Sequence, residues 1–122
     1  MFEVAVVMDF SAAHNLRGYK GKCETLHGHN WKVEVTLQAR RTDKIGMAED
    51  FGAIKAVLGE VLEGLDHRYL NELAPFKKTN PTSENIAQWV FQQMSRRGRR
   101  GLKVARVKVW ETERSSATYF ES

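Results

Sequence analysis

Three of the four histidines in this sequence, His14, His27 and His29, lie within one stretch of 16 residues. Side chains two apart on a β-strand point to the same side, about 6.5–7 Å apart along the chain, so His27 and His29 can converge on one ion. His14 follows an alternating segment whose antiparallel pairing with the segment after His29 would bring it near them. Three neutral imidazoles with an open fourth position are typical of a catalytic zinc site. The His-Gly-His pair alone also occurs among ordinary surface and core histidines, so the prediction depends on His14.

Cys23, four residues before His27, is the only cysteine, which excludes an intramolecular disulfide. Its thiol can be a metal ligand, an unligated thiolate that moves protons, or a small buried residue. Asp66 directly precedes His67, the fourth histidine, and such a pair can orient an imidazole as a base. A purely structural pair at a helix end is the alternative.

Glu111 occupies an odd position of the alternating segment 102–111, in which the preceding odd positions Ala105, Val107 and Val109 are apolar. Its carboxylate therefore falls on the apolar face of the predicted strand. If it is partly buried it needs donors, and a planar 2-amino-4-oxo heterocycle offers two N–H groups in a matching fork. An exposed strand end is the alternative.

The elements that must position these residues follow from periodicity. Alternation predicts four strands and a 3.6-residue period predicts two helices, the first of which Asp50 can cap. The strands are expected at 2–10, 30–39, 102–111 and 116–121, and the helices at 51–65 and from about 82 to 95. The order ββααββ predicts an α+β fold, one domain over residues 1–122, with an antiparallel sheet and two helices on one face. The polar second face would meet solvent or line a barrel closed by several subunits, which would also cover the edge strands.

Composition limits the function classes. A chain of 122 residues with 42% hydrophobic content suits one domain. Its net charge of +4 suggests an anionic ligand without requiring a polymer. We expect the arginines between Arg96 and Arg100 to interact with the C-terminal end of the second helix rather than with nucleic acid. No run of about 18 apolar residues is present, and Glu3 and Asp9 interrupt the N-terminal segment, which predicts a cytoplasmic protein without a membrane partner.

Several motifs, in order, resemble the 6-pyruvoyl-tetrahydropterin synthase family, including its bacterial 6-carboxytetrahydropterin synthase branch. They are Phe10–His14, Cys23–Asn30, Asp50-Phe51, Leu65–His67, Leu70-Asn71, Pro81–Asn85 and Trp110–Thr112. The resemblance covers nearly the whole chain. It implies the tunnelling fold, in which two trimers stack into a hexameric barrel with active sites between subunits.

The same resemblance implies roles for individual residues. The zinc ligands would be His14, His27 and His29, and the catalytic triad would be Cys23, Asp66 and His67. Glu111 would anchor the pterin, with Thr82 and Ser83 hydrogen-bonded to its ring, while Arg17, Lys20 and Lys22 are our candidates for phosphate contacts.

The implied activity is 6-carboxy-5,6,7,8-tetrahydropterin synthase, which converts 7,8-dihydroneopterin triphosphate to 6-carboxytetrahydropterin, acetaldehyde and triphosphate on the route to queuosine. The short chain and Cys23 favour this branch. The alternatives are a 6-pyruvoyl-tetrahydropterin synthase that only eliminates triphosphate, an aldolase-like enzyme on the same fold, and a non-catalytic module that binds zinc and nucleic acid.

Overall fold

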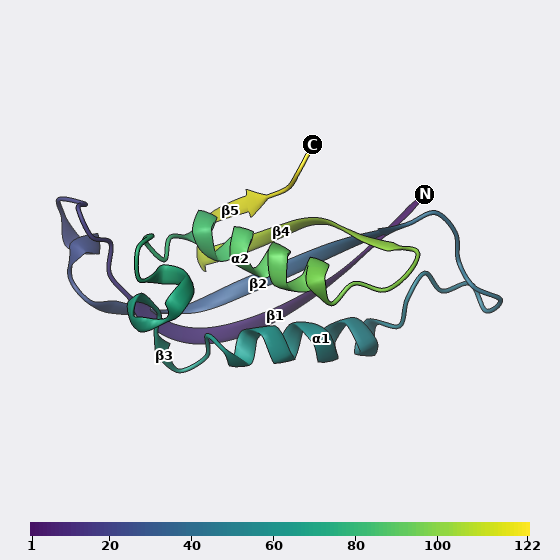
Figure 1. The fold of residues 1–122 in the computed structure, drawn as a ribbon, viewed down its shortest axis with the longest axis horizontal. Coiled ribbons are helices and arrows are strands. Elements are labelled where there is room, and N and C mark those ends of the chain that lie inside the picture. The colour runs from purple at the N-terminus through teal and green to yellow at the C-terminus, as the bar shows by residue number, and fades with distance from the viewer.

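A computed structural model describes all residues from 1 to 122 as an elongated sheet with two helices packed against it (Figure 1). The strands are β1 (Phe2–His14), β2 (His27–Ala39), β3 (Arg68–Tyr69), β4 (Leu102–Thr112) and β5 (Ser115–Tyr119), and the helices are α1 (Phe51–Glu63) and α2 (Ser83–Arg96). The sheet order is β3-β1-β2-β4-β5, antiparallel except where β3 pairs with β1. The predicted α+β fold is confirmed.

The first two strands form one long hairpin whose far end carries the predicted histidines. Its register runs from Phe2 opposite Ala39 to His14 opposite His27. Both strands extend beyond the predicted ranges by continuous backbone pairing, and the Ser11 hydroxyl donates to the Asn30 amide oxygen across them at 2.7 Å. The extension makes His14 the last residue of β1 and His27 the first residue of β2.

The core lies between the helices and one face of the sheet. Trp31, Val33 and Val35 of β2 are fully buried, and they pack in one cluster with apolar residues of both helices. The Asp50 side chain accepts the Gly52 N–H at 2.9 Å and so caps α1 as predicted. A wide apolar stripe on each helix therefore fixes that helix on the sheet.

Other details also differ from the sequence prediction, and α1 ends at Glu63 rather than at 65. A two-residue strand, β3, adds to the edge of the sheet by parallel pairing of Arg68 and Tyr69 with Ala12 and Ala13. The last strand covers Ser115–Tyr119 rather than 116–121. A pairing of two residues is too short to produce a periodic pattern, so sequence periodicity does not reveal it.

The outer face of the sheet is polar, as predicted. Arg106 of β4 pairs with Glu3 of β1, and the ring of Trp110 lies below the ammonium groups of Lys32 and Lys108. No helix in this chain is both long and apolar enough to cross a bilayer. Assembly into a barrel stays a prediction.

Candidate metal centre and neighbouring residues

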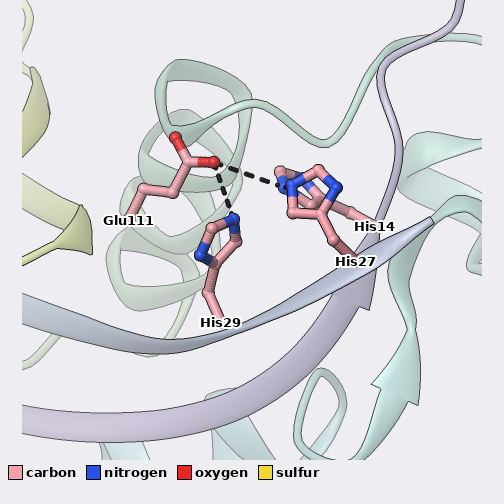
Figure 2. Close-up of side chains that lie close together, drawn as sticks. All are labelled: His14, His27, His29 and Glu111. Carbon is pink, nitrogen blue, oxygen red and sulfur yellow. Dashed lines mark hydrogen bonds and ion pairs between the residues drawn. The ribbon is translucent and has the colours of Figure 1, made fainter. Parts of the chain in front are cut away.

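The ends of three strands gather His14, His27, His29 and Glu111 (Figure 2). His14 and His27 face each other because they pair directly in the β1–β2 register. His29 lies two residues further along β2, and Glu111 comes from the end of β4. One nitrogen or oxygen from each of the four side chains lies within 4.8 Å of all the others. The predicted convergence of the three histidines is therefore present, and the carboxylate joins it.

Hydrogen bonds determine which nitrogen of each ring faces the centre. Nδ1 of His14 lies 2.8 Å from the Pro81 carbonyl oxygen, and Nδ1 of His27 lies 2.7 Å from that of Thr25. A carbonyl oxygen only accepts, so both Nδ1 atoms must donate, and each neutral ring keeps a lone pair on Nε2. These two Nε2 atoms are 3.0 Å apart. Because no proton lies between them, the two lone pairs repel each other at this distance. A cation bound by both nitrogens would remove that repulsion.

His29 supplies a third inward nitrogen. Its Nε2 is buried and lies 2.8 Å from a Glu111 carboxylate oxygen, yet the direction of approach does not make a hydrogen bond. The same oxygen lies 3.4 Å from Nε2 of His14. Three nitrogens beside one carboxylate match the donor set of a divalent metal such as zinc. The residues present therefore fit a metal ion.

Burial keeps the cluster ready to bind a metal. It lowers the pKa of His14 and of His29 below the ordinary value of 6.5, and the neighbouring His27 acts in the same direction. The Glu111 carboxylate opposes this effect without cancelling it. Both rings are therefore neutral near pH 7, which is the state that donates a lone pair to a metal.

These depressed pKa values predict how the stability of the metal-free protein depends on pH. Between 6.5 and the lower folded pKa values of His14 and His29, the unfolded chain binds more protons than the folded chain. The free energy of unfolding is therefore highest above pH 6.5 and falls as the pH drops from 6.5 to the folded values. We expect the thermal midpoint of chelator-treated protein to fall between pH 7 and pH 5. A midpoint that is constant over this range would contradict the prediction, and His29→Asn should show a shallower decline.

Asp66 and His67 form the predicted pair. Nδ1 of His67 lies 3.0 Å from an Asp66 carboxylate oxygen. Ser11 of β1 holds both residues, because its N–H donates to Asp66 at 2.9 Å and its carbonyl accepts the N–H of His67 at 2.6 Å. The Ser11 N–H, followed by the His67 side chain, lowers the pKa of Asp66, so this carboxylate stays charged.

The backbone of His67 is strained and its ring is open to solvent. Its φ of 57° is left-handed, a conformation that non-glycine residues adopt rarely and mostly at turns and functional sites. The side chain is 82% exposed. His67 lines an open depression of about 500 Å³ whose wall also contains His29. One residue of the metal cluster, His29, and one residue of the Asp66–His67 pair, His67, therefore line the same depression.

Cys23 lies apart from both groups. It occupies a short turn at Lys22–Glu24, is partly buried, and its sulfur makes no hydrogen bond. Its carbonyl accepts the Leu16 N–H at 2.8 Å, which ties this turn to the residues after β1. The thiol is not among the groups that gather at the histidines, and it makes no hydrogen bond with Asp66, whose side-chain partners are Ser11 and His67. Its role in proton transfer stays a prediction.

The N-terminal end of α2 contains two of the other predicted site residues. Thr82 caps α2, and its hydroxyl oxygen accepts the Asn85 N–H at 3.1 Å. That hydroxyl can still donate its own hydrogen. Ser83 is the first residue of α2 and makes no side-chain hydrogen bond.

Asparagines that the sequence prediction missed hold the segment before α2 beside His14. The Asn71 side chain bonds both the N–H and the carbonyl of Asn15, and the Asn80 side chain does the same with Arg17. Each side-chain amide forms the pair of backbone hydrogen bonds that a neighbouring strand would form. It thereby joins the residues after β1 to the segment before α2. The only sequence signals for these two asparagines are the dipeptides Leu70-Asn71 and Asn80-Pro81.

Arg17 also differs from its expected role. Instead of extending toward a phosphate, its guanidinium donates to the carbonyls of Asn71, Phe76 and Thr79. Lys20 and Lys22 are exposed and have no carboxylate partner.

Comparisons with known proteins agree with this geometry. A family model described as 6-pyruvoyl tetrahydropterin synthase matches residues 3–122. A putative 6-carboxy-5,6,7,8-tetrahydropterin synthase of Archaeoglobus fulgidus is 40% identical over 110 residues, with 90% of this chain and 88% of the relative covered. A 6-carboxy-5,6,7,8-tetrahydropterin synthase of Synechocystis sp. is 40% identical over 116 residues, with coverage of 91% and 87%. The structure of 6-pyruvoyl tetrahydropterin synthase from Caenorhabditis elegans superposes with a TM-score of 0.88 at 31% identity, with 99% and 96% covered.

Proposed function

Because this chain belongs to the 6-pyruvoyl tetrahydropterin synthase family, we propose that it is a 6-carboxy-5,6,7,8-tetrahydropterin synthase. Its substrates would be 7,8-dihydroneopterin triphosphate and water, and its products 6-carboxytetrahydropterin, acetaldehyde and triphosphate. The observation that carries the proposal is the convergence of three histidine nitrogens and the Glu111 carboxylate, one of whose members, His29, lines a depression together with His67.

We assign the metal to His14, His27 and His29, and propose that it is zinc. When bound, zinc would acidify the side-chain hydroxyls of the substrate and polarise the developing carbonyl. Three histidines complete the usual protein ligand set of a catalytic zinc site. Glu111 is then free to accept the two N–H groups of the pterin ring, with Thr82 and Ser83 as further hydrogen-bonding partners.

His67 and Cys23 are proposed to move protons. Since Nδ1 of His67 is engaged by Asp66, its Nε2 is the atom that exchanges a proton with a substrate oxygen. Cys23, as a thiolate, would move the proton at the side-chain carbon. Because these two residues do not meet within one subunit, the proposal requires Cys23 of one copy to approach His67 of another.

A hexamer built as a dimer of trimers would allow that approach. The sheet ends in β5 at one edge and in the two-residue β3 at the other, so most of the outer edge of β1 has no strand partner. Open edges of this kind are where additional copies can pair.

Product analysis tests the proposal directly. Metal-loaded protein is incubated with 7,8-dihydroneopterin triphosphate, and the products are identified by mass spectrometry. Acetaldehyde with a carboxypterin supports it. A pyruvoyl pterin identifies the other branch of the family, and cleavage to an aldehyde without a carboxypterin identifies an aldolase. No turnover together with salt-sensitive RNA binding would indicate a binding module.

Glu111→Ala separates an anchor from a metal ligand. We expect pterin binding to weaken by about tenfold to a hundredfold, because charge-assisted hydrogen bonds are lost, while metal content stays unchanged. The measurements are calorimetric titration with a pterin and metal analysis of the same sample. Glu111→Gln is the matched control, since it keeps the size but accepts at only one atom. Loss of metal would make Glu111 a ligand, and unchanged pterin binding would remove the anchor.

A further inference from the structure

The largest depression of the molecule lies at the opposite end of the sheet from the histidine cluster. Its volume is about 810 Å³, and the segments after β2 and before β4 line it. These segments meet because Ala39 pairs with Leu102 in the β2–β4 register. Ten strand residues, or about 33 Å, separate Ala39 from His29. Within one subunit the depression is therefore independent of the histidine site.

Basic side chains dominate this surface, which we name the basic depression. It is lined by Arg40, Arg41, Arg99, Arg100 and Lys103, together with the acidic Asp43 and Glu49. Of the five basic side chains, only Arg99 has a carboxylate partner. The other four are exposed and make neither an ion pair nor a side-chain hydrogen bond. Four unpaired cations around one hollow create a site for an anion.

The two carboxylates form no ion pair with those four cations. An oxygen of Asp43 accepts the N–H groups of Ile45 and Met47, which closes a tight loop. Glu49 accepts the Asp50 N–H at 2.8 Å and pairs with Arg99 at 3.0 Å. Both acids thus hold the walls of the depression in place, and basic side chains remain in excess around it.

The turn before β4 presents its arginines in a fixed position. The Leu102 N–H donates to the Arg99 carbonyl at 3.1 Å, and Gly101 within this turn has a φ of 85°. A glycine at such a position lets the chain turn tightly without strain. Arg99 and Arg100 therefore belong to one tight turn and line the depression together with Arg40 and Arg41.

We propose that the basic depression binds a polyphosphate group. Guanidinium forks match phosphate oxygens in charge and geometry. Five of the 19 Lys and Arg residues of the chain line this one depression. The ligand is either a free polyphosphate or the triphosphate chain of a substrate bound at another subunit's histidines.

Calorimetric titration of the full-length protein with inorganic triphosphate tests the proposal without turnover, so its outcome does not depend on the proposed function. We expect Arg40→Gln/Arg100→Gln to bind triphosphate at least about tenfold more weakly than the wild type. The matched control, Lys55→Gln/Lys77→Gln, removes the same charge at exposed positions outside the depression and should stay within about twofold. Equal thermal midpoints would show that both variants fold.

Three results would overturn the proposal: no triphosphate binding by the wild type, an equal loss in both double variants, or binding of a short RNA but not of triphosphate. Steady-state kinetics then distinguish the two sources. A raised KM for the pterin triphosphate in Arg40→Gln/Arg100→Gln, with kcat unchanged, shows that the depression holds the substrate's chain. Weakened triphosphate binding with an unchanged KM shows a free polyphosphate ligand.

Discussion

Metal binding and turnover should be lost together when His27 is replaced by alanine. His27 contributes one of three inward nitrogens, and its Nε2 lies 3.0 Å from that of His14. Removing a residue that only orients a ligand costs about tenfold to a hundredfold in metal affinity, so removal of a ligand itself should cost more than about a hundredfold. The side chain is partly exposed and lies outside the apolar core, so the fold should survive. Metal analysis after dialysis and the product assay check both effects.

His67→Ala is the matched control for that experiment. It also removes one imidazole, but from a side chain that is 82% exposed and outside the metal cluster. We expect its metal content to equal that of the wild type while turnover falls. A His27→Ala protein that retains metal after dialysis, or a His67→Ala protein that loses it, would contradict the ligand assignment.

Cys23→Ala should keep its metal and lose most of its turnover. A positioned proton-transfer group contributes about a hundredfold to ten-thousandfold to the rate, and kcat should fall by that factor. Because the thiol makes no hydrogen bond and is not in the metal cluster, the thermal midpoint and the metal content should change little. Near-normal activity in this variant would rule out the role assigned to Cys23.

Mixing subunits tests where Cys23 acts. If Cys23 of one copy works with His67 of another, co-assembled Cys23→Ala and His67→Ala chains should recover activity. In a random equal mixture about a quarter of the sites would contain both intact residues. Either variant assembled alone should stay inactive. No recovery in a mixture shown to have exchanged subunits would place both residues in the same copy and would contradict the proposed assembly.

The local pattern predicted most of the elements because their cause is local. Alternation in β2 and the apolar stripes of the helices depend only on side-chain period, and Asp50 caps the helix that it precedes. Neither β3 nor the docking by Asn71 and Asn80 was predicted. Each depends on a partner more than 50 residues away, at Ala12, Asn15 and Arg17, which no local pattern contains.

By itself, the sequence determined which residues are available for chemistry: three clustered histidines, one cysteine, an Asp-His pair and Glu111 on the apolar face of a predicted strand. It also determined the strand period that puts His27 and His29 on one side. Only the tertiary structure decided that Glu111 reaches the histidines and that four unpaired cations surround one hollow at the other end of the sheet. The physical reason is that strand register, set by the burial of one whole sheet face, brings distant residues together, and register is a property of the packed sheet.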